Sequence, residues 1–159
     1  MSNAPLLVRP SGAHGQVHGL TPANLKDRCP NWGYVGFELH RLAAGETAQV
    51  RTDAEEHLLV VIEGSMTLKI DDSDFGVVGK RTDIFSREKG YAAYIPGGGH
   101  DWQLRAETAL EVAVCKAPWK GGNHPRTADR TGRRAAGGPR EGRQYPLRQR
   151  DHDGGPGLG

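Results

Sequence analysis

Apolar and polar residues alternate in short stretches along the first part of the chain. Val35, Phe37 and Leu39 alternate with small or polar residues, and a similar alternation returns at residues 48–52. The intervening segment, residues 43–46, contains the glycine and polar residue typical of a turn. Because a period of two is typical of a strand with one buried face, the pattern predicts two neighbouring β-strands.

A continuous apolar run at Leu58–Ile62 has the pattern of a strand buried on both faces. Glu63-Gly64 follows this run, and alternation resumes at residues 66–70. A glycine-containing turn between two strand patterns predicts a β-hairpin.

Further strand patterns follow, separated by polar or glycine-rich turns. These strands are expected at residues 84–85, 91–95, 102–106 and 110–114. No window of ten or more residues shows the 3.6-residue period of an amphipathic helix. About eight short strands at this spacing predict an all-β sandwich or barrel, with helix as a minor component.

A change in composition sets the predicted domain boundary. Residues 121–159 contain ten Gly, four Pro and eight Arg, and their only large apolar residues are Tyr145, Leu147 and Leu158. Ordering a backbone costs about 1–2 kcal/mol per residue, and such a segment buries too little apolar surface to offset that cost. We therefore predict one folded domain over residues 1–120 and a disordered Arg/Gly/Pro-rich tail over residues 121–159.

Charge and apolar content exclude two classes of partner. The net charge is only +2 and four acids dilute the arginines of the tail, so no nucleic-acid partner is expected. The longest apolar runs are five residues, against roughly 20 for a membrane span, so no membrane partner is expected either. The N-terminus lacks the pattern of a secretory signal, which favours the cytoplasm. Cys29 and Cys115 are expected to be free thiols in that compartment.

Two motifs sharpen the fold prediction. Gly45-Glu46 and the later strand ending at Glu63-Gly64 resemble the first motif of a cupin domain. The spacing of Gly90, Pro96 and His100 resembles the second cupin motif, in which a proline turn precedes a histidine. The expected fold is therefore a cupin-type jelly-roll β-barrel.

A metal site in this barrel has only two candidate ligands, His57 and His100. The cupin metal set requires two histidines one residue apart, a carboxylate and the histidine of the second motif. Residues 49–53 contain no such pair, and His57 stands where the carboxylate is expected. Because a tight metal site needs three or four ligands, we expect no metal or other cofactor in this chain. The favoured interpretation is that His57 packs at its strand end and that His100 lies on an exposed glycine loop.

Other candidate residues have a structural interpretation that outweighs the chemical one, and no catalytic residue is assigned. Tyr91, Tyr94 and Trp102 offer a sugar-stacking surface, but aromatic residues on short strands usually fill the core. Cys115 is expected on the inner face of its strand if Leu110, Val112 and Val114 face the other way, and a buried, inert thiol is favoured over a nucleophile there.

Three longer strings, Leu6–Pro10, Tyr34–Glu46 and Ala106–Pro118, carry a more specific resemblance. Together they are similar to the N-terminal half of the KduI/IolB family, over about residues 5–120. The resemblance implies two barrels in one longer chain, with a divalent metal held in the second barrel. It also implies the 5-deoxy-glucuronate isomerase reaction, which converts 5-deoxy-D-glucuronate to 5-dehydro-2-deoxy-D-gluconate in myo-inositol catabolism. A small sugar acid is thus the expected substrate.

The second barrel of that family is missing from this sequence. Arg, Gly, Pro and Ala all have GC-rich codons, so one hypothesis is that residues 121–159 result from a frameshift that truncates a family member. Under this hypothesis the isomerase activity belongs to full-length members of the family, and this chain alone is expected to be inactive. The alternative function is a metal-free, non-catalytic single cupin that binds sugar acids or dimerises. A homo-oligomer formed through exposed apolar barrel surface is expected in either case.

Overall fold

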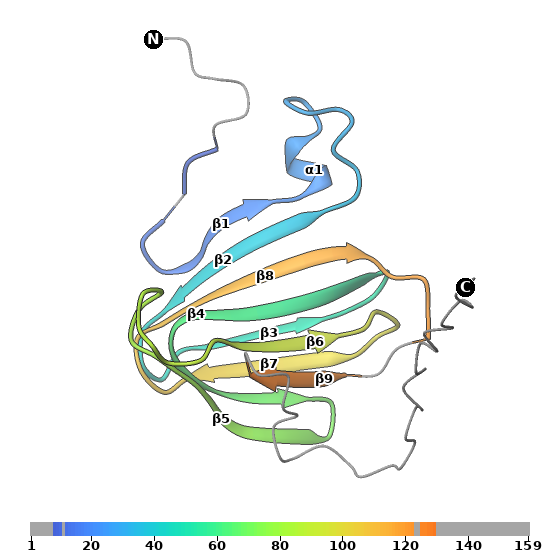
Figure 1. The fold of residues 1–159 in the computed structure, drawn as a ribbon. Helices are drawn as coiled ribbons and strands as arrows, with labels where there is room; N and C mark the ends of the chain where they lie inside the picture. Colours follow the sequence, from blue (N-terminus) through green and yellow to red (C-terminus); the bar gives the residue numbers. More distant parts are fainter. Residues whose placement is uncertain (1–7, 11, 123–124, 130–159) are drawn as a thin grey trace, which may run out of the picture.

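The computed structural model describes residues 8–10, 12–122 and 125–129 (Figure 1). Nine strands and one short helix make up this part of the chain. The elements are β1 Gly15–Leu20, α1 Pro22–Leu25, β2 Gly36–Leu42, β3 Thr47–Arg51, β4 Glu55–Ile70, β5 Ser73–Arg81, β6 Tyr91–Ile95, β7 Asp101–Ala106, β8 Leu110–Pro118 and β9 Arg126–Asp129. No helix in the described residues is long and apolar enough to cross a membrane.

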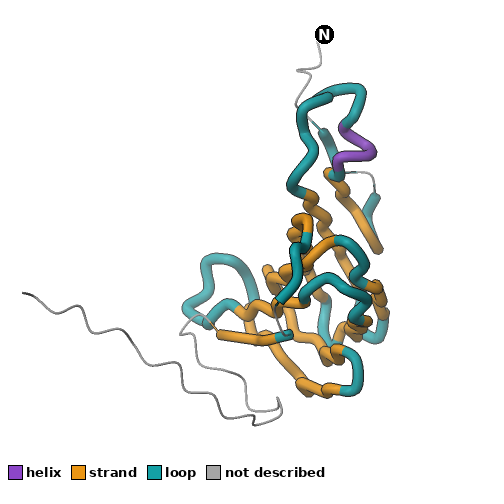
Figure 2. Tube along the Cα trace, turned by 90° about the vertical axis from the view of Figure 1, so that its right-hand side faces the viewer, coloured by secondary structure: helices purple, strands orange, loops and turns teal. Residues whose placement is uncertain are grey.

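The strands form two antiparallel sheets that share β4. One sheet, called sheet A here, has the order β1-β2-β8-β4-β6-β9. The other, sheet B, joins β3, β7 and β5 to the second half of β4. The helix α1 and the loop after it project beyond the strands at one end (Figures 1 and 2). The predicted all-β, cupin-type jelly-roll fold is confirmed.

The predicted hairpin at Glu63-Gly64 is wrong, because β4 runs through these residues as one continuous strand. Its first half pairs with β6 and β8, and its second half pairs with β5 and β7. Gly64 has a φ of 91°, and the pairing register shifts on either side of it. The glycine therefore bends the strand from one sheet into the other, and it does not reverse the chain.

Two further expectations about strands need correction. Residues 84–85 lie in a turn, and Phe85 is 88% exposed, so this pair forms no strand. Strands β1 and β5 were not predicted from the sequence pattern. In addition, β9 pairs with β6, so ordered pairing extends past residue 120. Residues 130–159, most of the predicted tail, lie outside the described residues, and their disorder stays a prediction.

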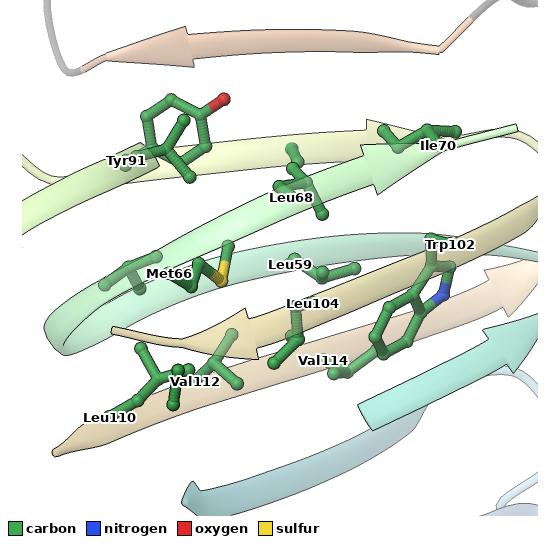
Figure 3. Close-up of a cluster of buried hydrophobic side chains, with 14 of the residues drawn as sticks. Leu59, Met66, Leu68, Ile70, Tyr91, Trp102, Leu104, Leu110, Val112 and Val114 are labelled. Carbon is green, nitrogen blue, oxygen red and sulfur yellow. The ribbon is translucent and has the colours of Figure 1, made fainter. Parts of the chain in front are cut away.

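The hydrophobic core lies between the two sheets (Figure 3). Sheet A contributes Leu59 and Val114, and sheet B contributes Leu68 and Leu104. Trp102 is fully buried among them. Both sheets therefore bury one face against the same core, which fixes the positions of the strands around the barrel.

Strand β2 presents its polar side to the barrel interior. Glu38 and His40 are buried, whereas Phe37 and Leu39 on the opposite side are only half-buried. The apolar alternation that predicted this strand therefore marks its outer face. Since buried polar side chains require partners, the inward side of β2 is where a functional site is expected.

Candidate functional site

Three polar side chains form a connected cluster inside the barrel. The Lys116 ammonium on β8 donates a hydrogen bond to one carboxylate oxygen of Glu38, with an Nζ–Oε1 distance of 2.5 Å. The His40 Nε2 atom lies 3.2 Å from the other oxygen, Oε2. Glu38 and Lys116 side chains are only 10% and 12% exposed. The antiparallel register of β2 and β8 brings them together, because Gly36 pairs with Lys116 two residues before Glu38.

His57 lies next to this cluster on β4, in register with Lys116 on β8. Its ring is 3% exposed, and its Nδ1 atom accepts a hydrogen bond of 3.0 Å from the indole nitrogen of Trp102. An indole N–H only donates, so Nδ1 must be the unprotonated nitrogen. In neutral His57 the proton is therefore on Nε2, which makes that atom a donor.

The environment sets the charge of both groups. Burial raises the pKa of Glu38, but hydrogen bonds from His40 and Lys116 and their charges outweigh it and lower the pKa to about 2. Burial and the nearby Lys116 charge lower the pKa of His57 to about 4, although Glu38 opposes this shift. Near neutral pH the interior thus holds an ionised carboxylate, an ammonium group and a neutral imidazole.

A pocket of about 410 Å³ opens over this cluster. It is lined by Val50, Arg51, Asp53, Ala54, Glu55, His57 and Lys116. The Arg51 side chain is more exposed than that of Lys116, and its Nη1 atom donates a hydrogen bond to Asp101 Oδ2 at 2.7 Å. Its Nε atom is 3.8 Å from Asp53 Oδ1. Charged groups of both signs therefore surround the pocket.

The pocket combines donors with acceptors. Lys116 donates one of its three N–H groups to Glu38, which leaves two further donors, and neutral His57 has one donor at Nε2. Asp53 and Glu55 supply carboxylate oxygens on the same lining. Such a set suits a small polyhydroxylated acid, whose carboxylate accepts from the cations and whose hydroxyl groups donate to the acids.

The residues in this pocket do not fit a divalent cation. Two of its lining side chains, Arg51 and Lys116, are cations that repel a metal ion. The lone pair of His57 on Nδ1 is already used by Trp102. Among the described residues, no group of three or more His, Cys, Asp or Glu side chains is arranged to hold a metal. The expectation that this chain carries no metal stays a prediction.

The two histidines proposed as candidate ligands have different surroundings. His57 is buried beside Trp102, whereas His100 is partly exposed and its Nδ1 atom lies 2.6 Å from Asp71 Oδ2. The backbone N–H of His100 also donates to the Thr52 hydroxyl at 3.1 Å. The structure therefore gives His100 a role in fixing the turn between β6 and β7, and only His57 lines the pocket.

The remaining candidates divide between the core and the outer surface. Tyr91 and Trp102 are core residues. Tyr94 lies half-buried on the outer face of sheet A, where its hydroxyl donates to Glu56 at 2.7 Å. Cys115 faces outward too and is half-buried, and burial raises the pKa of its thiol. The expectation that Cys115 lies on the inner side of its strand is wrong, because Val112 and Val114 fill that side.

Sequence reasoning missed the cluster of Glu38, His40 and Lys116. Glu38 and His40 occupy alternate positions of one strand, which was a usable signal for a shared face. Lys116 gave none, because the sequence does not reveal that β8 pairs with β2. The cluster depends on strand pairing between segments 78 residues apart.

Comparison with known proteins adds a second line of information. A family model described as the KduI/IolB family matches residues 6–139. The 5-deoxy-glucuronate isomerase of Geobacillus kaustophilus (strain HTA426) is 35% identical over 107 residues, which are 67% of this chain and 37% of the relative. The enzyme of the same name from Geobacillus thermodenitrificans (strain NG80-2) is 34% identical over the same shares of the two chains.

A solved structure agrees with these matches. An IolB-like protein from Salmonella typhimurium LT2 has a TM-score of 0.68 and 33% identity, and the match covers 76% of this chain and 43% of that one. The matched part of the chain thus spans 37% of the length of the two curated relatives and 43% of the solved structure.

Proposed function

The chain belongs to the KduI/IolB family, and we propose that it acts in the isomerisation of 5-deoxy-D-glucuronate to 5-dehydro-2-deoxy-D-gluconate in myo-inositol catabolism. The observation that carries this proposal is the family match over residues 6–139, together with two relatives named 5-deoxy-glucuronate isomerase. Homologues of this chain are thus named isomerases. The substrate and the reaction are the parts that we propose.

The proposed reaction moves hydrogen between two adjacent carbons. The aldehyde carbon becomes an alcohol while the neighbouring alcohol carbon becomes a ketone, so no atom is gained or lost. The pocket residues of this chain contribute binding in our proposal: Lys116 and the His57 Nε2–H contact the carboxylate of the sugar acid. The nearby acids Asp53 and Glu55 accept hydrogen bonds from its hydroxyl groups.

The test is to incubate the purified 159-residue chain with 5-deoxy-D-glucuronate and to follow the aldehyde and ketone carbons by NMR. Loss of the aldehyde signal with matching growth of the ketose signal supports the proposal. D-Glucuronate, which keeps the 5-hydroxyl group, is the control for substrate selectivity. Absence of conversion in a preparation that is folded by circular dichroism contradicts isomerisation by this chain.

The pocket favours a second candidate function, a metal-free module that binds sugar acids without converting them. The specific observation is that its cations, Arg51 and Lys116, suit a carboxylate and repel a metal ion, while the Nδ1 atom of His57 is already bonded to Trp102. Calorimetric titration with D-glucuronate tests this function independently of turnover. Binding without conversion supports the second function, and neither binding nor conversion contradicts both.

A matched pair of variants locates the binding. The double variant Glu38→Gln/Lys116→Met removes the ammonium group without leaving its buried carboxylate unpaired, and it is expected to weaken sugar-acid binding at least about tenfold. Lys120→Met removes the same charge from an exposed position outside the pocket, and its affinity is expected to stay unchanged.

A further inference from the structure

Two rows of uncharged residues cross the outer face of sheet A. The strand registers place neighbouring residues of β1, β2, β8, β4 and β6 side by side in each row. The first row is Leu20, Phe37, Cys115, Leu58 and Tyr94, and the second is His18, Leu39, Ala113, Val60 and Ala92. No Asp, Glu, Lys or Arg occupies these ten positions. Charged residues border the first row at Tyr94, which pairs with Arg126 of β9 and donates its hydroxyl hydrogen bond to Glu56. At about 4.8 Å per strand, the rows extend roughly 19 Å across the sheet.

This face is open in the described part of the molecule. Leu58, in the fourth of the five strands, keeps 39% of its surface exposed, and Val35, next to the start of β2, keeps 47%. Phe37 and Leu39 are half-buried in the same face. An apolar face of this extent on an antiparallel sheet is usually covered by another layer of protein.

The two longer segments outside the described part, residues 1–7 and 130–159, each contain only three large apolar residues. In residues 1–7 these are Met1, Leu6 and Leu7. Residues 130–159 continue from β9, at the edge of sheet A, and their only large apolar residues are Tyr145, Leu147 and Leu158. Seven arginines stand in the same segment. Three apolar side chains cannot bury two rows of five residues, and arginines would lose hydration over an uncharged face.

An uncharged face is compatible with a copy of itself. In a two-fold dimer the same face forms both sides of the interface, so a face with a large net charge meets like charge, whereas these ten positions do not. Two of the charged groups at the rim have partners within one chain: Arg41 pairs with Glu111 at 3.0 Å, and Glu56 accepts from the Tyr94 hydroxyl at 2.7 Å. We propose that a second copy of this chain packs on the outer face of sheet A through these two rows, forming a two-fold dimer.

The main test compares two exposed apolar positions on different sheets. Leu58→Lys places a charge in the first row, and Val77→Lys places the same charge on β5 of sheet B, where Val77 is 66% exposed. Light scattering after size exclusion is expected to show a dimer for the unchanged chain and for Val77→Lys, and a monomer for Leu58→Lys. Dissociation by Val77→Lys but not by Leu58→Lys overturns the proposal.

The thiol of Cys115 gives a second measurement that does not depend on any variant of the face. Its reaction rate with a small disulfide reagent, measured in a Cys29→Ser background, is expected to fall at least about tenfold as protein concentration rises, because the dimer covers Cys115. A monomer with Cys115 reactive at all concentrations overturns the proposal. A monomer in which Cys115 is protected at every dilution also overturns the proposal, because another part of the same chain would then cover the outer face of sheet A.

Discussion

Glu38 is a carboxylate that stays ionised inside a barrel because two neighbours donate to it. Lys116 and His40 occupy its two oxygens, and both partners are supplied by strands of the same sheet. Removing one partner of such a cluster leaves a buried charge, which costs more than the pair contributes. The cluster is therefore sensitive to single substitutions and tolerant of paired ones.

Substitution of Lys116 tests this asymmetry. Lys116→Met is expected to lower the free energy of unfolding by about 3–5 kcal/mol, because Glu38 loses its ammonium partner in a site where both side chains are nearly buried. Urea denaturation at about pH 7 measures the change. The double variant Glu38→Gln/Lys116→Met is expected to recover most of the loss, and an equal loss in both variants contradicts the explanation.

His57 and Glu38 determine how the free energy of unfolding is expected to change at acidic pH. The pKa of His57 is lowered from 6.5 to about 4, so between these values the unfolded chain binds more protons than the folded chain. The stability that neutral His57 permits is complete above pH 6.5 and falls by up to about 3 kcal/mol as the pH drops to about 4. For Glu38, whose pKa is lowered from 4.5 to about 2, the loss occurs below pH 4.5.

Urea denaturation at a series of pH values checks this order. His57→Gln, whose side-chain oxygen can accept the Trp102 hydrogen bond, is expected to flatten the decline between pH 6.5 and 4 and to leave the decline below pH 4.5. A His57→Gln profile parallel to that of the unchanged chain would show that another group carries the upper part of the decline.

At the scale of elements, Gly64 decides how β4 is used. Its φ of 91° is one that other residues rarely adopt, and a Cβ atom there would collide with the backbone oxygen of Ala109. The motif Glu63-Gly64 was interpreted from sequence as a hairpin because a glycine turn and a glycine bend look alike in one dimension. What separates them is the pairing of the flanking halves, and here each half pairs with different strands.

Alanine at two glycines separates the close approach from the dihedral angle. Gly64→Ala is expected to cost more than about 3 kcal/mol, since both the positive φ and the contact with Ala109 oppose it. Gly76 has a φ of 66° and open space around the position of an added Cβ atom. Gly76→Ala is therefore expected to lower the free energy of unfolding by only about 1–2 kcal/mol. Thermal unfolding measures both, and equal costs would show that the contact is unimportant.

The strand pattern predicts much of sheet A and sheet B but little of the candidate site. Period-two stretches located β2, β3, β7 and β8 to within a few residues, and a continuous apolar run located β6. The period-two pattern favours placing Phe37 and Leu39 on the buried side of β2, whereas the structure places Glu38 and His40 there. Where a protein covers an outer face or builds a polar interior, hydrophobicity alone assigns the faces incorrectly.

At the scale of the whole molecule, the orientation of β2 links the pocket to the outer apolar rows. Turning Glu38 and His40 inward to build the polar cluster necessarily turns Phe37 and Leu39 outward. The same strand therefore provides polar groups to one side of sheet A and an apolar surface to the other. The orientation that places the polar cluster inside the barrel therefore also creates an apolar outer face on sheet A.

Association through that face makes stability depend on concentration. The melting temperature of the unchanged chain is expected to rise by a few degrees for each roughly tenfold increase in protein concentration, because the dimer is favoured by mass action. Leu58→Lys is expected to remove this dependence. Differential scanning fluorimetry over a concentration series measures it, and a concentration-independent melting temperature in the unchanged chain contradicts the dimer.

Strand β4 lies at the centre of sheet A with one half and in sheet B with the other. Its amides near Leu59 and near Leu68 are bonded into different sheets but belong to one backbone segment. If β4 leaves sheet A, strands β6 and β8 lose a hydrogen-bonded neighbour. If it leaves sheet B, strands β5 and β7 lose one. Hydrogen exchange at the two ends of the strand is therefore expected to report a shared opening event.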